Sequence, residues 1–201
     1  YGMDTFKEIF SERQLLSLGV FSSTIRKTSQ EIEKYNNSVE FKNAIIGYLY
    51  CCLSRLADRN SEVCTWQVGS DKIGHTFTRY ALPFTWDFVE VMPWADSSGG
   101  FLQAVEWVAK AIDHLIVAGS HCPMSLAQQS SAINQSFSDL DLIVTDPPYY
   151  DAIGYGVVMD FYGVWLKPSL VGGIPETEPA VDLLGRPKWD HESNDGELVE
   201  D

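Results

Sequence analysis

The stretch Asp141–Asp151 reads DLIVTDPPYYD, and it contains the strongest signal in the chain for both fold and site. Its apolar residues predict a short strand over Leu140–Thr145, which runs directly into Asp146 and the pair Pro147 and Pro148. A proline holds its φ near −65° and has no N–H to donate, so two in succession form a stiff turn. The sequence therefore predicts a strand that ends in a rigid corner.

Apolar residues recur at helical spacing in several other parts of the chain. Helices are predicted over Thr5–Lys34 (in two pieces), about Val39–Arg59, about Phe101–Ala118 and Val157–Leu166, and further strands over about Val63–Val68 and Phe84–Met92. Strands that alternate with helices favour an α/β fold with a largely parallel sheet. Because such sheets bind ligands beyond the carboxyl ends of their strands, Asp146 is expected to lie in an active-site loop.

Short polar signals mark the ends of the predicted helices. Ser11 with Gln14 three residues later is typical of a capping box, and Ser38 is expected to cap the helix that follows it. The residue before a proline disfavours helical geometry, so the last helix is expected to end before Pro168.

Length and charge limit the possible classes of protein. The 201 residues fit one domain over 1–170, helical over 1–60 and α/β over 61–170, followed by an acidic tail over 171–201 that we expect to be flexible. The formal net charge is −14, and no basic stripe of the kind that binds phosphates is present, which argues against tight DNA binding by this chain alone. No apolar run of about 18 residues occurs, so we expect a cytoplasmic protein with no membrane contact.

The cysteines and tryptophans are interpreted as structural. Four cysteines occur without a Cys-x-x-Cys pair, which predicts reduced, mostly buried thiols and no metal site. Trp94, Trp107 and Trp165 are most simply core residues. His75 and Arg79 either contact nucleic acid or belong to a polar loop, with His75 as a satisfied buried histidine.

The corner at Asp146 is suited to holding an amine on a flat ring. An exocyclic amine of adenine or cytosine is a poor nucleophile, because its lone pair is delocalised into the ring. Acceptors on its two N–H bonds localise that lone pair, and the Asp146 carboxylate and the Pro147 carbonyl can supply them. Tyr149 can stack on a base that has left the helix stack. The predicted catalytic residues are thus Asp146, Pro147, Pro148 and Tyr149.

Two further residues extend this corner. Tyr150 is either part of the base pocket or a packed aromatic side chain. Asp151 is either a substrate-binding residue or the cap of the turn that follows. Both are taken as candidate substrate-binding residues.

Five stretches of the chain, in this order, resemble a known family. They are Leu53–Asp58, Lys72–Phe77, Ala81–Pro83, Trp86–Val91 and Asp146–Ile153. Together they resemble the large archaeal and bacterial adenine-specific DNA methylases that are associated with a zinc-ribbon insert, over roughly residues 1–170. The resemblance implies a Rossmann-like class I methyltransferase fold with additional helices. It implies S-adenosylmethionine-dependent methyl transfer to an exocyclic amine in DNA, with adenine N6 preferred over cytosine N4, as in restriction-modification.

The chain also departs from that family. Family members are several times longer, and neither their glycine-rich donor-binding loop nor their zinc-ribbon cysteines are found here. We therefore expect a piece of a methyltransferase that holds the base-side motif but not the donor pocket. Its cofactor-binding residues are thus unknown, and we expect no metal ligands. DNA binding is expected to come from regions outside this stretch. The expected partner is the remainder of the methylase or a subunit of a defence system.

Two alternatives remain open at the level of the sequence. RNA amino-group methyltransferases carry similar tetrapeptides, so the substrate could be RNA. The chain could also be a non-catalytic scaffold or subunit of a methylase complex that keeps the turn but depends on a partner.

Overall fold

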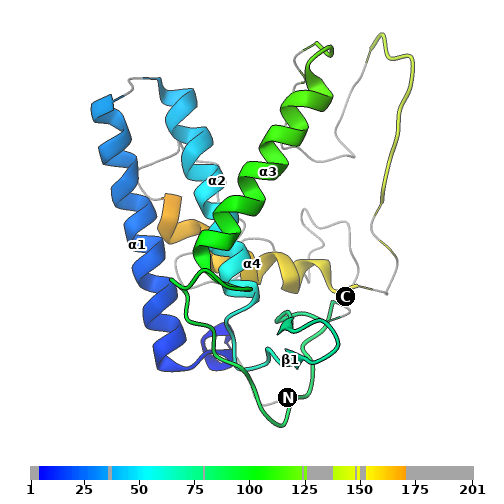
Figure 1. The fold of residues 1–201 in the computed structure, drawn as a ribbon. Coiled ribbons are helices and arrows are strands. Elements are labelled where there is room, and N and C mark those ends of the chain that lie inside the picture. Colours follow the sequence, from blue (N-terminus) through cyan, green and yellow to red (C-terminus); the bar gives the residue numbers. More distant parts are fainter. Residues whose placement is uncertain are drawn as a thin grey trace.

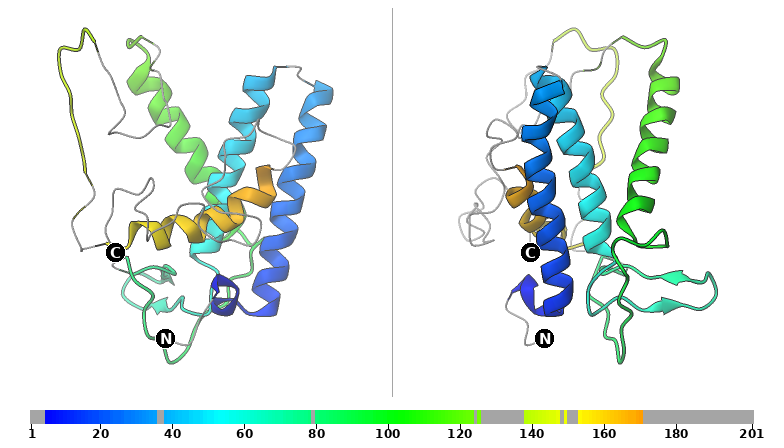
Figure 2. Two further views of the ribbon diagram at one scale, coloured as in Figure 1. Left: turned by 180° about the vertical axis from the view of Figure 1, so that it is seen from behind. Right: turned by 60° about the vertical axis from the view of Figure 1, so that its left-hand side comes forward.

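The computed structural model describes residues 5–35, 38–78, 80–123, 125, 138–147, 149 and 153–170, and most of these are helical. The elements in chain order are the 3-10 helix η1 (Phe6–Ile9), α1 (Glu12–Tyr35), α2 (Val39–Asp58), β1 (Trp66–Gln67), β2 (Lys72–Ile73), α3 (Phe101–Gly119) and α4 (Tyr155–Leu170). Figure 1 shows α1 and α2 as an antiparallel pair that α4 crosses, whereas α3 leans away from α2 toward its C-terminal end. The two further views in Figure 2 show the same arrangement.

Side-chain caps explain where the first two long helices begin. At α1, the Gln14 backbone N–H donates to Ser11 Oγ at 3.2 Å, and the Ser11 N–H donates to Gln14 Oε1 at 2.9 Å. At α2, Ser38 Oγ accepts from the Phe41 N–H at 3.1 Å. Each cap satisfies a backbone donor that the first helical turn leaves unpaired. The capping box and the Ser38 cap predicted from the sequence are confirmed.

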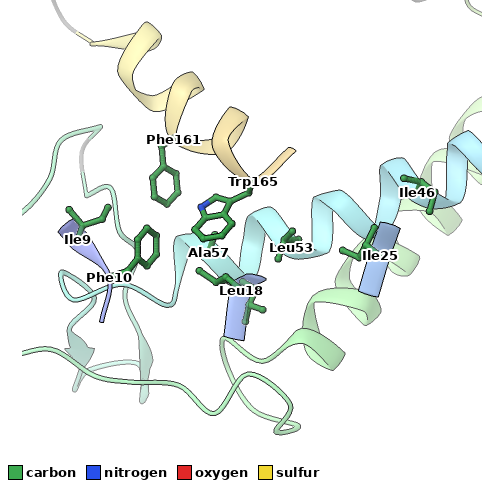
Figure 3. Close-up of a cluster of buried hydrophobic side chains, with 10 residues drawn as sticks. Ile9, Phe10, Leu18, Ile25, Ile46, Leu53, Ala57, Phe161 and Trp165 are labelled. Carbon is green, nitrogen blue, oxygen red and sulfur yellow. The ribbon is translucent and has the colours of Figure 1, made fainter. Parts of the chain in front are cut away.

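The hydrophobic core lies where η1, α1, α2 and α4 meet (Figure 3). Phe161 on α4 is fully buried, and its ring lies among those of Phe6, Phe10 and Phe77, with centroid separations of 5.6, 5.9 and 5.0 Å. Trp165, one turn later, meets Phe10 edge to face at 5.5 Å. Aromatic rings in these offset and edge arrangements contribute beyond the apolar area that they bury. Through Phe161 and Trp165, α4 anchors the N-terminal segment to the helix pair.

The predicted α/β fold with a mostly parallel, Rossmann-like sheet is wrong. Strand pairing in the described ranges is limited to β1 and β2, two residues each and antiparallel, with one isolated bridge between Thr78 and Ala81. The predicted strand Leu140–Thr145 is not helical, but it is exposed and pairs with no other described strand. The predicted strand Phe84–Met92 makes a backbone hydrogen bond from Val89 N–H to the Cys64 carbonyl at 2.9 Å, yet forms no ladder. Apolar alternation indicates extended backbone, but a sheet also needs partners.

The predicted helices are present, with shifted ends. The first region divides into η1 and α1 as expected, and α2 and α3 match their predicted ranges closely. The last helix, α4, begins at Tyr155 and runs on to Leu170, so the expectation that it ends before Pro168 is wrong. Pro168 falls in the last turn of α4, where its missing N–H costs the helix one backbone hydrogen bond close to its end. The predicted tail over 171–201 lies outside the described residues.

Residues 59–100 form an irregular region at one end of the helix pair, between α2 and α3 (Figure 1). Hydrogen bonds to the end of α2 hold it: the Thr76 N–H donates to the Asp58 carbonyl at 2.6 Å, and Arg59 Nη1 donates to the Ile73 carbonyl at 2.8 Å. The Gly74 N–H donates to the Thr65 carbonyl at 2.8 Å and closes the β1–β2 hairpin. None of the described helices has the length and apolar character that crossing a membrane requires.

The cap on α2 leads to a first prediction. Ser38→Ala is expected to lower the free energy of unfolding by about 1 kcal/mol, because the Phe41 N–H loses its partner. Urea denaturation followed by far-UV circular dichroism measures this loss. Ser23→Ala, at a half-buried position inside α1, is the matched control and is expected to change stability by less than about 0.5 kcal/mol. Equal effects of the two substitutions would contradict the assigned cap.

Candidate functional site

The corner predicted to bind a base is open to solvent. Asp146 and Pro147 are exposed, and the Tyr149 side chain is 57% exposed. Among the described residues, no hydrogen bond or ion pair engages the Asp146 carboxylate. Pro148, Tyr150 and Asp151 lie outside the described residues. A carboxylate and a phenol ring are therefore both available to a ligand within four residues of chain.

This corner ends a segment that stands apart from the helix pair. Residues 138–147, in yellow, lie beyond α3 from α1 and α2 in Figure 1. Leu142, Ile143 and Val144 are all exposed, Val144 to 83%. Contiguous exposed apolar patches on a protein surface mark interaction sites. The segment that leads to Asp146 thus has the character of a contact surface.

A second polar cluster lies at the end of α2. His75 Nδ1 is 2.5 Å from Asp58 Oδ2, and His75 Nε2 is 3.2 Å from Arg59 Nη2. A guanidinium can only donate, so Nε2 accepts from Arg59 and Nδ1–H donates to Asp58. Both ring nitrogens are engaged, which leaves none free to act as a base. His75 is therefore hydrogen-bonded at both nitrogens, but its side chain is 44% exposed, so it is not the buried histidine of the prediction. Arg79 lies outside the described residues.

Tyr162 borders this cluster, and Tyr50 hydrogen-bonds to the backbone of Tyr162. The Tyr50 hydroxyl donates to the Tyr162 carbonyl at 2.9 Å. Burial raises the pKa of Tyr162 well above its ordinary value, and the Asp58 carboxylate raises it further. Burial also raises the pKa of Tyr50. Both phenols stay protonated at neutral pH, and the hydrogen bonds of these residues tie α4 and residues 73–76 to α2.

The buried thiol of Cys52 is unreactive. All four cysteines are free; Cys52 and Cys64 are buried, and Cys51 and Cys122 are exposed. Burial, assisted by the neighbouring Cys51, raises the pKa of Cys52 to about 11. Since the thiolate is the nucleophile and the metal ligand, this thiol is unreactive at neutral pH. No group of three or more potential metal ligands comes together within the part of the chain that the structure describes.

A pocket of about 270 Å³ opens between the first turns of α1 and the loop before α3. Its lining consists of Arg13, Gln14, Ser17, Asn60 and residues 90–94. Trp94 contributes to this lining and is 63% exposed, and Trp107 on α3 is also exposed, so the interpretation of both as core residues is wrong. Trp165 is buried as predicted.

Sequence reasoning did not find this pocket. Its residues come from three separate segments, and neither Gln14 nor Asn60 belongs to a motif that binds ligands. The capping box accounts for the carbonyl oxygen of Gln14 but not for its amide nitrogen. The signal available in the sequence was Gln14, a polar residue on the face of α1 that is buried.

Comparison of the chain with family models, curated proteins and solved structures finds no match in any of the three. The resemblance to adenine-specific DNA methylases therefore rests on the quoted motifs alone. Two of them, Leu53–Asp58 and Lys72–Phe77, meet at the contact between Asp58 and His75.

Proposed function

We propose that this chain contributes the base-binding corner of an S-adenosylmethionine-dependent methyltransferase acting on the exocyclic amine of a nucleobase in DNA, with adenine N6 as the preferred target. The observation that supports this most is the exposure of Asp146, Pro147 and Tyr149 together at one turn. A corner whose carboxylate and ring were packed inward would be unable to receive a base.

Each of these residues has a defined part in the proposal. The Asp146 carboxylate and the Pro147 carbonyl accept the two amine N–H bonds, which localises the nitrogen lone pair. The Tyr149 ring stacks on the base and holds it out of the helix stack. Holding the reacting amine in one orientation is worth about 7–11 kcal/mol of the barrier when its partner is also fixed.

The pocket described above is a poor candidate for the methyl-donor site. The pocket of about 270 Å³ does not include Asp146 in its lining and lies below the roughly 300–1,000 Å³ that drug-sized ligands occupy. Nor does the chain contain the glycine-rich loop of the family. We infer that the donor pocket belongs to a further polypeptide segment or a partner subunit, which covers Leu142, Ile143 and Val144 when it docks.

The chain alone is accordingly expected to bind S-adenosylmethionine more weakly than micromolar. Isothermal titration calorimetry of the purified 201 residues tests this directly. Micromolar binding would contradict the division into a base-binding corner and a separate donor pocket, although it would leave the chemistry of Asp146 untouched.

The substrate class is tested with the enzyme that contains this chain. Plasmid DNA and total RNA are incubated separately with tritium-labelled S-adenosylmethionine and digested to nucleosides. Label in N6-methyladenine from DNA is the expected result. Label from RNA only would favour the RNA alternative, and label from neither would favour a non-catalytic scaffold; both results overturn the proposal.

A further inference from the structure

Residues 138–147 form a segment that no other described part of the chain covers. All of them are exposed, including the apolar side chains of Leu140, Leu142, Ile143 and Val144. Figure 1 shows the segment as an extended trace. Within the described part of the chain, its backbone makes no hydrogen bond. Extended backbone whose N–H and C=O groups are unpaired is a template onto which a strand of another polypeptide can add.

Every charged side chain of this segment is acidic. Asp139, Asp141 and Asp146 are exposed, and none of them has a hydrogen bond or ion pair among the described residues. Along the sequence, no Lys or Arg occurs between Lys110 and Lys167, whereas six aspartates do. The segment therefore combines exposed apolar side chains with uncompensated negative charge. A partner that matches it carries apolar side chains together with Lys or Arg, because binding surfaces are complementary in charge.

The order of the side chains defines the pattern that the partner must present. Successive side chains of a strand point to opposite faces, so strand pairing places Leu142 and Val144 on one face and Asp141 and Ile143 on the other. Side chains opposite each other on paired strands are in contact. A partner strand that alternates apolar and basic residues thus brings apolar side chains to Leu142 and Val144 and a cation to Asp141.

Charge disfavours the other occupants of this segment. A second copy of the chain would bring the same three carboxylates, and like charges opposite each other on paired strands are destabilising. Residues 171–201 hold nine acids against two bases, so the C-terminal part of the chain itself is repelled as well. DNA alone is repelled for the same reason, because its phosphates bind to Lys and Arg.

We propose that residues 140–145 pair, as a strand, with an extended segment of a partner polypeptide in which apolar residues alternate with Lys or Arg. The inference rests on the proposed function for the identity of this partner, which is the segment or subunit that carries the donor pocket. Pro147 has no N–H to donate, so pairing ends before it and leaves Asp146 and Tyr149 open to the base. The cations of the partner also offset the acids that DNA must approach.

The test is an NMR titration of the ¹⁵N-labelled chain with the end-blocked peptide Lys-Val-Lys-Val-Lys-Val-Lys. Saturable shifts of the backbone amides of residues 140–145 are expected. The peptide Lys-Lys-Val-Val-Val-Lys-Lys has the same composition without the alternation, and it is expected to bind about tenfold more weakly or worse. Glu-Val-Glu-Val-Glu-Val-Glu has the opposite charge and is expected not to bind. Equal binding of the two basic peptides, or shifts that do not saturate, would overturn the proposal.

Substitutions of the backbone donors test strand pairing. Leu142→Pro and Ile143→Pro each remove one N–H, and these two N–H groups point to opposite edges of the strand. At least one of the two is expected to weaken binding of the alternating peptide about tenfold or more. Both positions are exposed, so the unfolding temperature stays unchanged. Unchanged binding in both variants contradicts strand pairing.

Substitutions of the carboxylates test the match of charge. Asp139→Asn combined with Asp141→Asn is expected to weaken peptide binding about fivefold at low salt, since one exposed ion pair contributes only about two- to threefold. Asp113→Asn, at an exposed carboxylate on α3, is the matched control and leaves binding unchanged. Equal binding by the double variant and the unsubstituted chain contradicts the proposed basic partner.

Two further results separate this inference from its alternatives. Sedimentation velocity at neutral pH is expected to show a monomer, and a dimer that Ile143→Pro dissociates would show that a second copy occupies the segment, which overturns the proposal. The peptide titration contains neither DNA nor S-adenosylmethionine. Absence of peptide binding beside adenine N6 methylation by the intact enzyme would therefore refute the docking alone, whereas peptide binding without methylation would refute the proposed function alone.

Discussion

Replacement of Phe161 by alanine is expected to lower the free energy of unfolding by about 3–5 kcal/mol. Phe161 is fully buried, and its ring meets those of Phe6, Phe10, Phe77 and Tyr162. Its removal deletes the transfer free energy of a phenyl group and leaves a cavity that four neighbouring rings are too rigid to fill. Because those rings come from three segments of the chain, removal of the Phe161 ring weakens the packing between all three segments.

Urea denaturation monitored by far-UV circular dichroism measures the effect of Phe161→Ala. The matched control is Phe84→Ala, since Phe84 is the same residue type but 82% exposed. This control is expected to change stability by less than about 0.5 kcal/mol. A loss below about 1 kcal/mol in Phe161→Ala would mean that α4 is not anchored through this ring.

The second large effect is expected at the proposed base-binding corner. In the enzyme that contains this chain, Asp146→Ala is expected to lower the rate of methyl transfer by about 10²–10³-fold, similar to the loss of one preorganised polar contact. The reason is that the amine loses the charged acceptor that localises its lone pair. Because Asp146 is exposed and has no partner among the described residues, the substitution leaves stability unchanged.

Asp141→Ala provides the matched control for this experiment. Asp141 is also an exposed carboxylate, on the same segment and five residues earlier. The Asp141→Ala substitution removes the same charge from the same segment, so a purely electrostatic effect on DNA binding would appear in both variants. Initial rates with plasmid DNA are compared at equal concentrations of folded enzyme. Full activity in Asp146→Ala would refute the assigned role. Equal losses of activity in the two variants would mean that Asp146 acts only through the negative charge of the surface.

Local interactions made much of the helical structure predictable. The capping box of Ser11 with Gln14, the cap at Ser38 and the apolar spacing within residues 39–59 each involve groups only a few residues apart. Such interactions join residues that lie close together in the sequence, so the beginnings of α1 and α2 can be predicted from it. The helix α4 shows the limit of this reasoning, since a proline in its last turn does not end it.

Non-local structure was not predictable in the same way. A strand is stable only beside another, and the sequence of Leu140–Thr145 specifies an apolar segment but not a neighbour. The contact between Asp58 and His75 joins residues 17 positions apart, and no spacing rule implies it. The pocket at Asn60 likewise requires three segments to meet. The corner at Asp146 could be proposed from the sequence because its residues lie within one short run; its role stays a prediction.

The uncovered run of Leu142, Ile143 and Val144 has a practical consequence for handling the isolated chain. Short apolar stretches with high strand propensity can stack between molecules into cross-β assemblies. At neutral pH the net charge of −14 keeps molecules apart by mutual repulsion. This repulsion disappears near the isoelectric point of about 4.5, so we expect precipitation and fibre growth to begin in acidic buffers.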